Sequence, residues 1–171
     1  MKKPIVKRRN KKELNLKTIS GVACYILIVI YETQLKNIEL VEELKIGFET
    51  NLFTGKCKSK DYYNEFDLAK KLLSITNNAS TLISAFRYLK DKDFLVFDES
   101  RASNDGYSFH GFHLTANGID VIEDSKINPL KSKEFARTFN LGVSFNVDSI
   151  IRANNIVGVG GAASVDLGLG N

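Results

Sequence analysis

Cysteine and histidine are scarce in this chain of 171 residues, which has two of each. Cys24 and Cys57 are far apart, and Cys24 stands within an apolar run, where a free thiol is commonly buried. We therefore expect no disulfide and a reducing, cytoplasmic location. His110 and His113 cannot supply the three or four ligands that zinc needs, and no Cys or His cluster completes a set.

The chain also lacks an apolar run of the length that a membrane span needs. Apolar residues dominate from about Ile19 to Tyr31, whereas a spanning helix requires roughly 20 of them. No Ala-x-Ala cleavage site follows. We expect a buried helix that starts at Thr18 or Ser20 and ends near Lys36. Because it is apolar all round, it is also the candidate interface of a homodimer, and a membrane anchor or uncleaved signal is the alternative.

Signatures of catalysis are missing as well. His110 with Asp105 could imitate part of a nucleophile and base, but no nucleophile elbow accompanies them. Gly158, Gly160 and Ala163 fit the G-x-G-x-x-A spacing of dinucleotide sites, yet only eight residues follow, too few for the helix and second strand of such a site. We expect a non-enzymatic protein without cofactor or metal.

Positive charge is concentrated at the N-terminus. Residues 1–17 hold eight Lys or Arg and one Glu, a net charge of +7, which leaves −3 for the other 154 residues out of a total of +4. We interpret residues 1–15 as a flexible basic arm, with Arg8 and Arg9 as candidates for phosphate contact. A solubilising terminus is the alternative.

Two helices separated by a polar break are predicted in the middle of the chain. The first covers about 64–73, and the break is Thr76-Asn-Asn78. The second begins at Ala79 or Ser80 and has helical spacing of the apolar residues Leu82, Ile83, Phe86 and Leu89. Its opposite face, expected to meet a partner, is Thr81, Ser84, Arg87 and Tyr88. Residues 38–60 are expected to form a short amphipathic helix, through Phe48, and a loop.

A hairpin and a capped helix follow. Phe94–Phe97 is short enough for a strand, Ser103–Gly106 has strong turn chemistry, and Tyr107–Leu114 returns as the second strand. The apolar alternation in that strand changes phase at Gly111, which predicts a bulge that would also bring His110 and His113 to one face. Thr115 is expected to cap the last helix.

This buried pattern resembles that of MarR-type and YjcQ-like bacterial winged-helix proteins. The residues concerned are Leu68-Ala69, Leu72, Ile75, Leu82-Ile83, Leu89, Phe94-Leu-Val96 and Leu114-Thr115-x-x-Gly118. The resemblance implies an α+β winged helix-turn-helix over residues 16–127, with 38–60 as an insertion. Asp93 stands where those families usually have Gly, and Asp can adopt the left-handed conformation required there.

Residues 128–171 lie outside the resemblance. Phe139, Leu141, Val143, Phe145 and Val147 alternate with polar residues or Gly, which predicts a strand. A short helix over 150–153 and a Gly-rich tail that is flexible until bound are expected after it.

The leading functional hypothesis is a DNA-binding or regulatory protein, phage-like or bacterial in style. Its candidate contacts are Asn77, Asn78, Thr81, Ser84, Arg87, Tyr88, Arg101, Lys70, Lys71, Arg8 and Arg9. The alternative is a protein-interaction module, such as an immunity or host-takeover factor, because acidic residues surround Arg101 in the hairpin.

Overall fold

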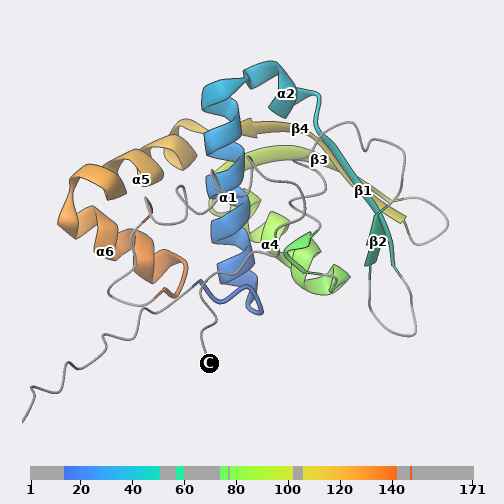
Figure 1. Cartoon of the computed structure of the whole chain (residues 1–171), viewed down its shortest axis with the longest axis horizontal. Helices are drawn as coiled ribbons and strands as arrows, with labels where there is room; N and C mark the ends of the chain where they lie inside the picture. Colours follow the sequence, from blue (N-terminus) through green and yellow to red (C-terminus); the bar gives the residue numbers. More distant parts are fainter. Residues whose placement is uncertain are drawn as a thin grey trace, which may run out of the picture.

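The computed structural model describes residues 14–50, 57–59, 74–76, 78–101, 106–141 and 147. Their elements are α1 (Ile19–Lys36), α2 (Ile38–Glu42), β1 (Lys45–Thr50), β2 (Cys57–Ser59), α4 (Ala79–Asp91), β3 (Leu95–Arg101), β4 (Gly106–Leu114), α5 (Ala116–Ile127) and α6 (Pro129–Thr138). The predicted α+β class is confirmed, and Figure 1 shows α1 between the α5–α6 pair and the sheet.

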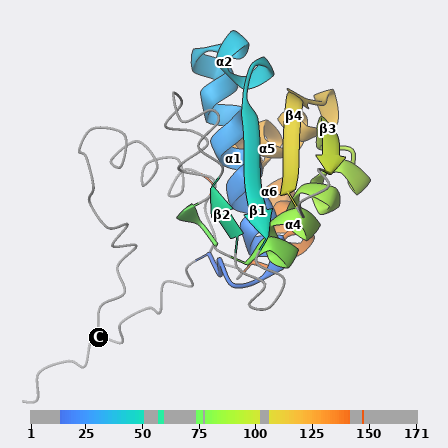
Figure 2. The same cartoon turned by 90° about the vertical axis from the view of Figure 1, so that its right-hand side faces the viewer.

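The sheet has the strand order β2-β1-β4-β3, and each neighbouring pair is antiparallel. Ile46 of β1 lies opposite Phe109 of β4, and both are fully buried. Figure 2 shows the strands side by side with α1 behind them, so helices cover one face of the sheet. Apolar alternation in the strands therefore faces α1 and α4.

A bulge in β4 realigns that alternation. Gly111 and Phe112 lie opposite the single residue Phe97, because the flanking pairs are Asp98 with His110 and Val96 with His113. Gly111 has a φ of 64°, a conformation that Gly adopts without strain. Phe109 and Phe112 are both buried as a result. The predicted bulge is confirmed.

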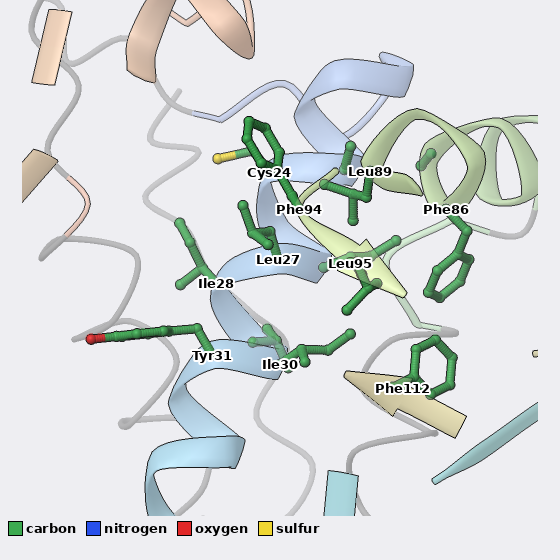
Figure 3. Packing of buried hydrophobic residues seen from close by; sticks show 14 of the residues in the cluster. Cys24, Leu27, Ile28, Ile30, Tyr31, Phe86, Leu89, Phe94, Leu95 and Phe112 are labelled. Atoms are coloured by element: carbon green, nitrogen blue, oxygen red, sulfur yellow. The ribbon is translucent and has the colours of Figure 1, made fainter. Parts of the chain in front are cut away.

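Helix α1 is the centre of the core. Thr18 caps it, as predicted, by accepting a hydrogen bond from the Gly21 amide. Ten of its eighteen residues are buried, from Gly21 to Tyr31, by side chains of the same chain. Figure 3 shows Leu27 and Ile30 beside Leu95, while Tyr31 extends in another direction.

This burial agrees with the expected core helix, and it bears on two other expectations about α1, a membrane anchor and a homodimer interface. The helix is long and apolar enough to cross a membrane by length and composition, but a core helix passes the same test, and more than half of the tested window is buried inside the chain. The reason for placing a homodimer interface on it no longer holds, because its own chain covers it. Cys24 is buried and free, and burial raises the pKa of its thiol.

Helix α4 connects α1 to the sheet. Asn78 caps it, and Leu82, Phe86 and Leu89 are fully buried as the spacing predicted. The Phe86 ring lies 4.6 Å from the Phe109 ring and 5.6 Å from the Phe112 ring, between centroids. These aromatic contacts determine how α4 sits against β4.

The turn after α4 has the geometry predicted for it. Asp93 adopts a φ of 55°, in the left-handed region. Thr115 caps α5 by accepting a hydrogen bond from the Gly118 amide, and its hydroxyl donates to the Asp93 carbonyl. A Cβ at Gly118 would lie 2.1 Å from the Phe94 carbonyl oxygen, so only Gly permits this close approach.

The expectation for residues 38–60 is partly wrong. A short helix forms, but it ends at Glu42, and Phe48 belongs to strand β1 instead. Cys57–Ser59 forms β2 where a loop was expected. Pairing of β1 with β4 is the physical reason, since it places Ile46 opposite Phe109 and buries both side chains in the core.

The expected strand over 139–147 is also corrected where the structure describes it, at residues 139–141 and 147, while 142–146 lie outside the described residues. Phe139 is the C-cap of α6, where its ring packs 4.9 Å from that of Phe135, and Asn140 follows with a φ of 53°. Helix α6 was missed, although Asn128 followed by Pro129 is a strong helix-start signal. The predictions for residues 64–73, 103–105 and 150–171 lie outside the described residues.

Candidate functional site

Six of the eleven predicted contact residues lie in the described part of the chain. Asn78, Thr81, Ser84, Arg87 and Tyr88 are on α4 or its cap, and Arg101 ends β3. Asn77, Lys70, Lys71, Arg8 and Arg9 lie outside the described residues. The candidate site is therefore the surface where α4 meets the hairpin, which we call the α4–hairpin face and define as Asn78, Thr81, Ser84, Arg87, Glu99 and Arg101.

The N-terminal end of this face is held by a helix cap. The side-chain oxygen of Asn78 accepts a hydrogen bond of 3.0 Å from the Thr81 amide. The Asn78 amide in turn donates to the Thr76 hydroxyl at 3.1 Å. Because capping already uses the side-chain oxygen, Asn78 has less freedom to pair with a base than an uncapped Asn would.

An ion pair joins the middle of α4 to β3. Arg87 donates from Nε to Glu99 Oε2 at 3.1 Å and from Nη2 to Glu99 Oε1 at 2.6 Å. The side chains are 55% and 24% exposed, so both remain at the surface. This bond raises the pKa of the Arg87 guanidinium, which stays charged. The bidentate geometry makes the pair more specific than an ordinary surface contact.

Tyr88 was expected to face a partner, and the structure shows it partly buried and packed against the end of α6. Its hydroxyl donates to the backbone carbonyl of Thr138, and its ring lies 6.1 Å from that of Phe139. Burial raises the pKa of its phenol. Tyr88 therefore connects α4 to the end of α6, which the prediction could not include because α6 was not foreseen.

Arg101 extends the face along the hairpin. Its guanidinium lies 5.5 Å from the centroid of the Tyr107 ring, across the β3–β4 pair. A single residue, Ser100, separates it from Glu99, so both side chains project from the same side of β3. Lys90 is drawn toward the sheet, donating at 3.1 Å to the Phe97 carbonyl. The face thus has two Arg side chains, and Glu99 neutralises the charge of Arg87.

Polar groups also occupy the other face of the hairpin. The hydroxyls of Ser100 and Ser108 are 2.6 Å apart, and His113 Nδ1 lies 3.6 Å from Glu42 Oε1. His110 Nδ1 is buried and has no hydrogen-bond partner among the described residues. Within the described ranges, no group of three or more His, Cys, Asp or Glu side chains is placed to hold a metal ion.

Glu99 is the residue of this site that sequence reasoning missed. It was treated as one of the acids that weaken Arg101, whereas it pairs with Arg87, twelve residues earlier. Strand β3 follows α4 after a short turn and runs back beside it. That order of elements was the signal that could have indicated a contact between the two. Taken together, the α4–hairpin face offers hydroxyl, amide and guanidinium donors suited to recognition by hydrogen bonds. No protein-family model, curated protein or solved structure matches this chain.

Proposed function

We propose that this chain is a winged helix-turn-helix protein that binds DNA through α4 and the β3–β4 hairpin. The observation that carries the proposal is the sheet order β1-β4-β3 next to α4, with β3 and β4 joined as the hairpin that follows that helix. In a winged helix the second helix of the motif enters the major groove, which is about 12 Å wide, and the hairpin lies alongside.

The side chains of the α4–hairpin face support a contact with bases more than with phosphates. Thr81 and Ser84 offer hydroxyls, and Arg87 offers a charged fork. Glu99 on β3 is exposed and offsets the charge of Arg87. The basic arm at residues 1–15 would therefore supply much of the phosphate contact.

A binding titration tests this function. Labelled duplex DNA of mixed sequence is titrated with the full chain at about 50 mM and about 200 mM salt. We expect binding that weakens steeply with salt and weakens further when residues 1–13 are deleted. Lys133→Ala on α6 is the control, because it removes one exposed positive charge outside the face. Absence of binding at the lower salt would contradict the proposal.

The second candidate is a protein-interaction module, favoured by the neutralisation of Arg87. Among the described strands, β3 has a sheet neighbour on one side only, β4. An edge strand can accept an extended segment of a partner through backbone hydrogen bonds. This function becomes the leading one if the DNA titration shows no binding.

A further inference from the structure

The arrangement of donors on Arg87 carries an inference that rests on the proposed DNA binding. A guanidinium has five N–H donors in one plane. Glu99 takes two of them, on Nε and Nη2, and so occupies one side of the fork. Within the part of the chain that the structure describes, no acceptor other than Glu99 bonds to Arg87, so the end of the fork, formed by Nη1 and the second hydrogen of Nη2, can take two further acceptors.

The free end of the fork matches the acceptors of guanine. O6 and N7 lie side by side on the major-groove edge of guanine, and Arg pairs with both in the commonest specific base contact. Glu99 restrains the otherwise flexible Arg side chain from the side, so its free end has a defined direction. The Glu99 carboxylate also repels phosphate oxygens at the same place, which disfavours a purely electrostatic contact.

We propose that Arg87 reads guanine and that Glu99 is its positioning residue. The pair is supplied by two elements, α4 and β3, so the direction of the fork depends on how the hairpin sits against the helix. In the alternative role, Glu99 only neutralises the charge of Arg87 and so weakens DNA binding. The two roles predict opposite effects when the carboxylate is removed.

Selection from a randomised duplex library, followed by titration of the selected site, separates these roles. We expect Arg87→Ala to reduce discrimination in favour of guanine at one position by about tenfold. Arg87→Lys keeps the charge but lacks the fork, so the same discrimination is expected to fall while overall affinity is largely kept. Glu99→Gln keeps the size but loses the charge, and it should reduce the same preference by at least about threefold.

Asp98→Asn is the matched control, since it removes one exposed carboxylate from the neighbouring position of β3 without touching Arg87. It should change affinity for all duplexes equally and leave base preference unchanged. Tighter binding of Glu99→Gln to every duplex, with unchanged preference, would overturn the positioning role. If the wild type binds DNA but Arg87→Ala loses no guanine preference, this assignment fails alone. If the wild type binds no duplex at low salt, the proposed function fails with it.

Discussion

At the scale of single residues, Tyr31 shows how a buried polar group joins two helices. Its side chain is almost fully buried, yet its hydroxyl donates to Glu123 Oε1 at 3.0 Å. Lys126 donates to the same hydroxyl at 3.4 Å and lies 4.5 Å from the ring centroid. Burial first, and the Glu123 carboxylate second, raise the pKa of Tyr31 to about 12. The contact thus favours the neutral phenol.

The raised pKa of Tyr31 predicts a pH dependence of stability. The unfolded phenol loses its proton near pH 10, whereas the folded one keeps it to about 12. The contribution of Tyr31 is therefore fully present below about pH 10 and is lost as the pH rises toward about 12. We expect the free energy of unfolding, measured in urea, to fall less steeply over this range for Tyr31→Phe. Glu123→Gln should reduce the slope partially, and an unchanged slope in Tyr31→Phe would contradict the assignment.

At the scale of elements, the bulge at Gly111 lets β4 bury the aromatic residues on both sides of it against the core. If β4 kept its sequence but ran as a regular strand without the bulge, Phe109 and Phe112 would point to opposite faces, because side chains alternate along a strand. With it, both reach the Phe86 ring. Gly111 allows this, since a residue with a side chain would be strained at its φ of 64°.

Substitution of Gly111 tests the bulge. We expect Gly111→Ala to lower the free energy of unfolding by about 1–2 kcal/mol, because the new Cβ is strained at a φ of 64°. It would also lie 3.4 Å from Asp98 Oδ2. Gly111→Asn should cost less, since Asn adopts the left-handed region more readily. Equal losses in the two variants, measured by urea unfolding, would show that the backbone conformation is not the cause.

Elements whose signals are local were predicted well, and those that depend on distant pairing were not. Thr18, one of the two expected caps, and Thr115 begin their helices as predicted, because a cap acts within a few residues. Helix α4 starts at Ala79 as expected, although Asn78 was not foreseen as its cap. Strand β1 was missed because Phe48 continues the helical spacing of α2, and only its pairing with β4 decides between the two. Phe139 alternates like a strand residue but packs on Phe135 at the end of α6.

At the scale of the whole molecule, α1 is the element on which the other layers pack. It lies between α5 and the sheet in Figure 1, and its buried residues join α4, β3 and β4 in one hydrophobic cluster. A helix of this kind stabilises the fold through burial, which contributes about 25 cal/mol for each Å² of apolar surface removed from water. Its role in the fold can be measured directly.

Two substitutions in α1 separate a core helix from a membrane anchor. Leu27 is fully buried, and Leu27→Ala should reduce the free energy of unfolding by about 2–5 kcal/mol through the cavity it leaves. Leu35, on the same helix, is 64% exposed, so Leu35→Ala should change it by no more than about 0.5 kcal/mol. Urea unfolding of the purified chain checks both. Similar small effects would contradict a core role.

The sequence by itself determined the starts of α1, α4 and α5, the hairpin with its bulge, the left-handed Asp93, the burial of α1 and Cys24, and the placement of cations in a terminal arm. Each of these depends on residues close together in the chain or on composition. Only the tertiary structure decided that Arg87 pairs with Glu99, that Tyr88 packs against the end of α6, and that residues 45–50 join the sheet. These depend on which elements meet, and that choice is made by packing the whole core at once.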